Sequence, residues 1–296
     1  MLPAPRSLLL ASLLFTACAG LVAAATDYEV RLNRASAVGD HYRVVASGTD
    51  EQAMTATVDG QPVQSRKEAM AVEMIAECEV MAVTPKGREA QIKLTIEKLW
   101  RIDPAQAGEL LPPGSIVMAE IAGSRTKFTV SGEPVSRVVA KALETIGVNV
   151  RGDDKASDDE IFGATGRKQV GDSWAINSAP AAAELAKMGI PATADKVTGQ
   201  TTLAEAVQQD GQAALRLTGT MEIKDIAPPL PPGIELQSCL MKSTMSGLFP
   251  VDVSKKVLQE STTLSMEVKA GGTQNGRTME MHMTKKSSRE SKMSYK

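Results

Sequence analysis

The chain has 296 residues, a formal net charge of −2 and only 3% aromatic residues. The small negative charge excludes a basic surface for nucleic acid or an anionic membrane. The scarcity of aromatic residues argues against rows of rings that stack on bases or sugars, and leaves aliphatic residues and methionine to fill the core.

The first residues follow the order of a secretory signal. Arg6 precedes an apolar stretch, Ser7–Val22, and Ala23–Ala25 supply the small residues of a cleavage site. A positive end, a short apolar core and small residues at the cut define such signals. The pattern predicts a signal peptide at residues 1–25, a mature chain starting at Thr26, and a periplasmic or extracellular protein.

A second processing route starts from Cys18. Phe15-Thr16-Ala17-Cys18 is similar to a bacterial lipobox, in which the cysteine carries lipid. This alternative predicts a chain anchored to a membrane through Cys18. Soluble export is favoured, because Phe15 replaces the usual leucine and apolar residues continue past Cys18. No later segment is long and apolar enough for a membrane-spanning helix, so we expect no transmembrane segment in the mature chain.

Alternation of apolar and polar residues dominates the mature chain. One apolar face carries Met70, Val72, Met74, Ala76, Cys78 and Val80, and similar runs follow Arg88 and Gln212. Such alternation is typical of antiparallel strands with one buried and one wet face. Hairpin turns are indicated at Asp59-Gly60, Lys86-Gly87, Asp210-Gly211 and Asn275-Gly276. The pattern predicts a mostly β (α+β) fold built from curved antiparallel sheets.

Three landmarks occur twice, in the same order. They are Gly39-Asp40-His41-Tyr42 with Gly171-Asp172-Ser173-Trp174, the turns at Gly87 and Gly211, and Leu111-Pro112-Pro113-Gly114 with Leu230-Pro231-Pro232-Gly233. This recurrence predicts an internal duplication. We expect a first β unit at residues 26–150, ending in a helix, an acidic linker at 151–168, and a second β unit at 169–296.

Two helices are predicted within this pattern. The first has an apolar stripe at helical spacing, with Pro134 in its first turn and Gly147 at its end; the stripe comprises Val135, Val138, Val139, Ala142, Leu143 and Ile146. The second, shorter helix spans Ala179–Met188, with Ser178 as its cap and Gly189 as its stop. We expect the first helix to place its stripe on a sheet.

Residues that commonly carry chemistry are few. His41 and His282 accompany no strained nucleophile turn, and the acids of the linker do not have the spacing of a calcium loop. Cys78 is expected to point inward and Cys239 outward, which disfavours a disulfide, and no pair of ligands has zinc spacing. We therefore predict no catalytic residue, no metal and no cofactor.

The two Gly-Asp segments and Asp159-Glu160-Ile161-Phe162-Gly163 upstream of the second resemble a family of exported bacterial envelope proteins known as a domain of unknown function. That family occurs in planctomycetes, verrucomicrobia and bacteroidetes, and the similarity covers nearly all of the mature chain. The resemblance implies export and no known activity. More loosely, a curved antiparallel sheet crossed by a helix looks like periplasmic lipoprotein carriers, which is an analogy of fold alone.

The leading functional hypothesis is a non-enzymatic envelope protein that binds an apolar small molecule, a lipid or an envelope protein in a groove between sheet and helix. The candidate groove residues are Tyr42, Trp174, Val139 and Leu143. For Tyr42 and Trp174 there is an alternative, structural role, in which each ring anchors the first strand of its unit in the core. Two alternatives are a structural or interaction scaffold of the envelope, and a secreted hydrolase.

Overall fold

The computed structural model describes residues 26–103, 106–123, 125–187, 190, 192–226, 230, 233–274 and 276–295. The predicted signal peptide, Cys18, Met188, Gly189, Pro231, Pro232 and Asn275 lie outside these residues. Across the described ranges, no helix has the length and apolar character that crossing a membrane requires.

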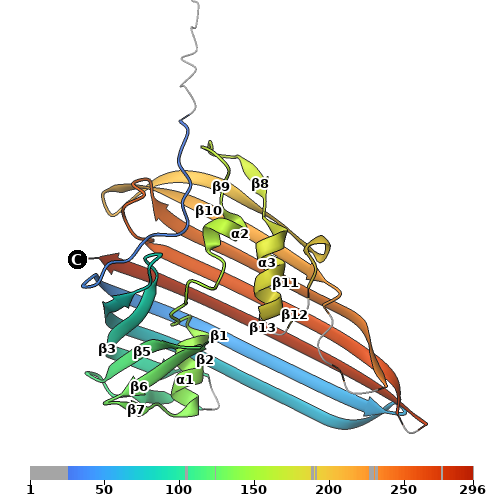
Figure 1. Cartoon of the computed structure of the whole chain (residues 1–296). Helices are drawn as coiled ribbons and strands as arrows, with labels where there is room; N and C mark the ends of the chain where they lie inside the picture. The colour runs from blue at the N-terminus through green and yellow to red at the C-terminus, as the bar shows by residue number, and fades with distance from the viewer. Residues whose placement is uncertain are drawn as a thin grey trace, which may run out of the picture.

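The strands join into a single antiparallel sheet (Figure 1). The first half of the chain contributes β1 (His41–Val58), β2 (Gln61–Val83), β3 (Glu89–Arg101), β4 (Gly108–Leu111), β5 (Ile116–Ala122), β6 (Arg125–Val130) and β7 (Glu133–Pro134). The second half contributes β8 (Ser173–Ala175), β9 (Val197–Gln209), β10 (Gln212–Lys224), β11 (Ile234–Pro250), β12 (Gln259–Gln274) and β13 (Arg277–Tyr295). The order is β7-β6-β5-β3-β2-β1-β13-β12-β11-β10-β9-β8, with β4 beside β3. The predicted mostly β fold is confirmed.

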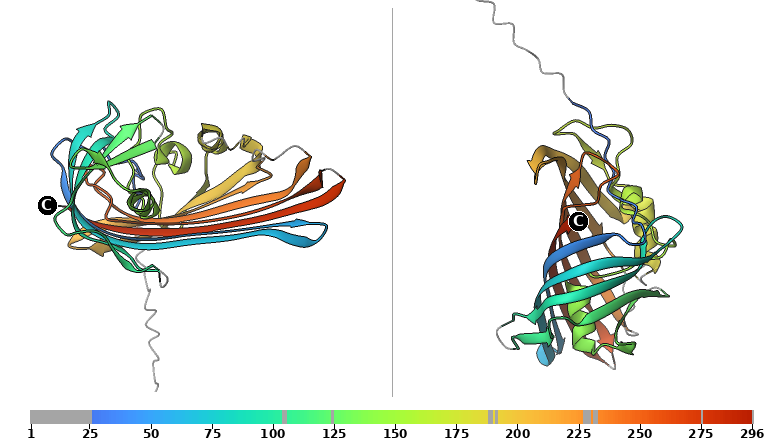
Figure 2. Two further views of the ribbon diagram at one scale, coloured as in Figure 1. Left: turned by 90° about the horizontal axis from the view of Figure 1, so that it is seen from below. Right: turned by 90° about the vertical axis from the view of Figure 1, so that its left-hand side faces the viewer.

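The helices lie on one face of this sheet, called the inner face below (Figure 2). They are α1 (Arg137–Thr145), α2 (Asp158–Phe162) and α3 (Ser178–Lys187), and a short 3-10 turn, η1 (Ala194–Lys196), precedes β9. The six alternating residues of β2 from Met70 to Val80 are all buried on the inner face, as predicted. Residues 41–58 and 279–295 run past the helices, so part of the inner face lies beyond them (Figure 2).

The two halves of the chain meet where β1 pairs with β13. The pairing is continuous from Tyr42 opposite Tyr295 to Val58 opposite Met279. Each half is therefore a meander whose core packs to one side of this join: one around α1, the other around α3. The join brings the first strand of the first half against the last strand of the second.

The two Gly-Asp turns have the same hydrogen bonds. Asp40 Oδ2 accepts from the Ala37 amide, and Asp172 Oδ2 accepts from the Gln169 amide, each at 2.8 Å. Gly39 and Gly171 have φ values of +90° and +94°, which glycine adopts without strain. Their amides bond the carbonyls of Val80 and Leu203 on the following long strands. The duplication stays a prediction, and these matched turns support it.

Helix α1 ends where predicted but begins later. Gly147 stops it with a φ of +86°, whereas Ser136 caps its start by accepting from the Val139 amide. The prediction that Pro134 opens the helix is wrong, because Pro134 lies in β7, where it pairs with Thr129 of β6. On the helix, Val139, Ala142 and Leu143 are buried, while Val138 is 44% exposed and leaves the predicted stripe.

The predicted direction of Cys239 is also wrong. A β-bulge between Leu236 and Ser238 inserts one residue into β11 and reverses the alternation that follows it. Cys239 is therefore buried on the inner face beside Met241, as Cys78 is in the other core. The two cysteines belong to separate cores and are both free thiols.

Burial on α1 can be tested with two identical substitutions at neighbouring positions. Val139→Ala is expected to lower the free energy of unfolding by about 2 kcal/mol, because it removes buried methyl groups and leaves a cavity. Val138→Ala is the matched control and should change it by less than about 0.5 kcal/mol, since its side chain is solvated. Urea unfolding measures both, and equal losses would contradict the described packing.

Candidate functional site

A cavity of about 520 Å³ lies on the inner face at the join between the halves. Its floor is made by alternating residues of the central strands: Tyr42, Val44 and Ala46 of β1, Arg289, Ser291 and Met293 of β13, and Glu260 and Thr262 of β12. Leu94 and Ile146 contribute from the first core, and Met245 and Phe249 from a further apolar cluster of the second half, separate from the core around α3. The cavity thus occupies the gap between two packed cores.

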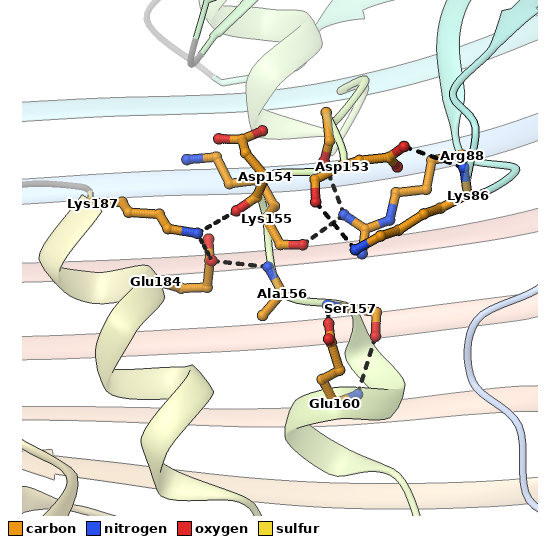
Figure 3. Close-up of polar contacts among 11 residues, drawn as sticks. Lys86, Arg88, Asp153, Asp154, Lys155, Ala156, Ser157, Glu160, Glu184 and Lys187 are labelled. Atoms are coloured by element: carbon orange, nitrogen blue, oxygen red, sulfur yellow. Dashed lines mark hydrogen bonds and ion pairs between the residues drawn. The ribbon is translucent and has the colours of Figure 1, made fainter.

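The segment between α1 and α2 forms part of the cavity wall and is tied to both halves (Figure 3). On the first half, Arg88 Nη1 donates to the carbonyls of Gly152 and Lys155 at 2.9 and 2.8 Å, and Thr84 Oγ1 donates to Asp153 at 2.7 Å. On the second half, the Ala156 amide donates to Glu184 of α3 at 2.8 Å. The predicted acidic linker is therefore ordered, and it contains α2.

A second part of the wall comes from residues 32–36, which precede β1. Asp159 of α2 accepts from the amides of Leu32 and Asn33 at 2.7 and 3.1 Å. Arg34 donates to the carbonyls of Pro250 and Asp252 at 2.9 and 3.0 Å. Acids that the sequence presents as a solvated run thus hold backbone groups in place, which their spacing alone does not reveal.

One end of the cavity holds a cluster of hydroxyl groups around Glu89. Ser36 Oγ and Tyr42 Oη donate to this carboxylate at 3.2 and 3.3 Å, and the ring of Tyr295 lies 5.4 Å from that of Tyr42. Burial raises the pKa of Glu89 above its usual range, and the two hydrogen bonds oppose the rise. Burial also raises the pKa of Tyr42, so its phenol stays protonated and acts as the donor.

Charged side chains stand on the floor between the apolar walls. Arg289 and Glu260 come from adjacent strands; burial lowers the pKa of Arg289 and raises that of Glu260. Protein atoms crowd around both side chains, yet Arg289 is only half-buried and Glu260 is exposed to the open space of the cavity that both border. The sequence analysis missed them, although the alternation of Met279, Met281 and Met283 extended along β13 places Arg289 on the same face.

Of the predicted groove residues, only Tyr42 lines the cavity. Val139 and Leu143 are buried in the first core, where they pack α1 on the sheet. Trp174 packs against the core of the second half, and its Nε1 donates to the Phe162 carbonyl at 2.8 Å. Cys18 lies outside the described residues. The predicted set is thus not brought together at one site.

The histidines and Cys78 lie outside the cavity. His41 and His282 lie on the outer face of the sheet, within 3.7 and 3.2 Å of Glu79 and Glu267. Burial raises the pKa of Cys78 to about 12, which keeps its thiol protonated. Within the described part of the chain, no group of three or more His, Cys, Asp or Glu residues is arranged to hold a metal ion.

The raised pKa of Glu89 predicts how stability depends on pH. Its unfolded value is near 4.5, and the folded value is higher, so the ionised carboxylate destabilises the fold as pH rises through the folded pKa. Glu89→Gln should therefore be more stable than wild type at pH 8, with the advantage gone at pH 4. Urea unfolding at both pH values measures this. Equal destabilisation of Glu89→Gln at both pH values would contradict a cost of burying the ionised carboxylate.

No protein-family model matches the chain, and no curated protein does. Among solved structures, an outer membrane channel from Pseudomonas putida F1 is 8% identical, covering 90% of this chain and all of that chain, with a TM-score of 0.20. A toluene transporter of P. putida is also 8% identical, covering 88% of this chain and 91% of that one, with a TM-score of 0.17. At these scores neither likeness establishes a shared fold.

Proposed function

We propose that this chain is a non-enzymatic binding protein of the cell envelope that holds an apolar small molecule or lipid in the cavity between its two cores. The observation that carries the proposal is the cavity itself. Its volume of about 520 Å³ falls within the range of about 300–1,000 Å³ that is usual for small-molecule sites.

The composition of the walls supports an apolar ligand. Four methionines line the cavity, Met74, Met221, Met245 and Met293, and they come from strands on both sides of the join. Methionine side chains are flexible and polarisable, so such walls adapt to ligands of differing shape. The envelope location rests on the export pattern of residues 1–25, and the non-enzymatic role on the position of both histidines outside the cavity.

A cavity-filling variant tests the proposal. Ser291→Trp places an indole on the cavity floor, and Ser294→Trp places the same group on the exposed outer face of the same strand. The neutral fluorophore N-phenyl-1-naphthylamine should bind wild type and the Ser294 variant alike. Ser291→Trp should weaken its affinity by about tenfold or more, because the indole takes the ligand's volume.

Fluorescence titration gives the affinities, and circular dichroism confirms that both variants are folded. Equal affinities for the two folded tryptophan variants would show that the probe binds elsewhere. No saturable binding to wild type would overturn the proposal.

A further inference from the structure

Arg289 borders the cavity and has no ion-pair or hydrogen-bond partner among the residues that the structure describes. Its side chain rises from β13 beneath the end of α1, where a Cβ added at Gly147 would lie 3.2 Å from Nη1. A half-buried cation that is not paired attracts an anion more strongly than a fully exposed one, since fewer water molecules compete for it.

The other cations around the cavity are already engaged. Among the residues that the structure describes, five basic side chains line it against three acidic ones: Arg34, Arg88, Arg151, Lys256 and Arg289 against Glu89, Asp158 and Glu260. Arg34 and Arg88 donate to backbone carbonyls, and Lys256 pairs with Asp40 at 2.9 Å. Arg151 is exposed, and its Nε donates to Asn149 Oδ1 at 3.1 Å. Basic side chains thus outnumber acidic ones around the cavity, although the chain as a whole has a net charge of −2. Of these cations, Arg289 is the one without a hydrogen-bond or ion-pair partner among the described residues.

Acidic groups nearby restrict where an anion gains. Asp158 and Glu260 face the same space and interact with Arg289 and Arg151 without contact at ion-pair distance. Their negative charges repel an anion at any position in the cavity that is not directly on a guanidinium. Affinity for a negative group therefore depends on Arg289 itself rather than on a diffuse positive field.

Apolar residues line the cavity on both sides of this charge, with Thr262 between Arg289 and Met245. Ile146 and Val148 follow α1 on one side, and Met245 and Phe249 lie on the other. A ligand that satisfies both features has one anionic group and an apolar body.

We propose that the cavity takes an anionic amphiphile, with a carboxylate or phosphate head on Arg289 and an acyl-type tail between the methionine-rich walls. This inference rests on the proposed function and names the chemical class of its ligand. A guanidinium binds either head through paired N–H···O contacts, so the two heads share one recognition chemistry.

Three ligands with the same twelve-carbon tail separate head from tail: dodecanoate, dodecyl phosphate and dodecan-1-ol. Each competes with N-phenyl-1-naphthylamine for wild type, Arg289→Gln, Arg289→Lys and Lys292→Gln. Lys292 is the matched control, because it stands exposed on the outer face of the same strand and loses the same single charge. Circular dichroism confirms that each variant is folded.

Wild type should bind at least one anion about tenfold more tightly than the alcohol, and Arg289→Gln should abolish that preference, so that this variant binds the anions no more tightly than the alcohol. Arg289→Lys should restore part of the preference, and Lys292→Gln should keep all of it. The tighter of the two anions identifies the head as carboxylate or phosphate.

Equal wild-type affinities for alcohol and anions, or a preference that survives in Arg289→Gln, would overturn the anionic head and leave the apolar site standing. If no ligand displaces the probe, or the probe itself fails to bind wild type, both proposals fail.

Discussion

The pairing of β1 with β13 is the constraint on which the rest of the structure depends. It joins strands whose residues are more than 200 positions apart in the sequence, and without it each meander would present a long unpaired edge. Because the pairing is antiparallel and in continuous register, the inner faces of both halves form one surface. Cores pack on both sides of the join, so the strands between them carry a cavity rather than a helix.

The cavity stays open because the segment between α1 and α2, which forms part of its wall, is held by both halves of the chain. Arg88 binds this segment to the first half, and Glu184 binds it to α3 in the second half. Glycine sets how closely α1 approaches: a Cβ added at Gly48 of β1 would lie 2.5 Å from the Thr145 carbonyl oxygen. A glycine inside a strand often marks such a close backbone approach. Beyond this contact, Arg289 and Glu260 lie on the cavity floor in place of packed apolar side chains.

Local patterns in the sequence predict strands and their buried faces well, because the alternation of residues 70–80 depends only on the pleat. They predict less where one residue changes the alternation, as the bulge before Cys239 does. They do not predict the β1–β13 pairing, since partners so distant along the chain share no local signal. For the same reason Tyr42 could be singled out as an aromatic, but not placed in a cavity with Arg289, whose neighbours come from segments remote in sequence.

The central proposal is that a small amphiphilic molecule occupies the space between the two cores. The most direct measurement is the intact mass of protein isolated from its native cells without detergent, recorded under native and then denaturing conditions. This proposal predicts a native mass that exceeds the denatured chain by one small molecule, released with an anionic head and an apolar tail. Equal masses in both conditions, from protein that is folded and monodisperse, would contradict it.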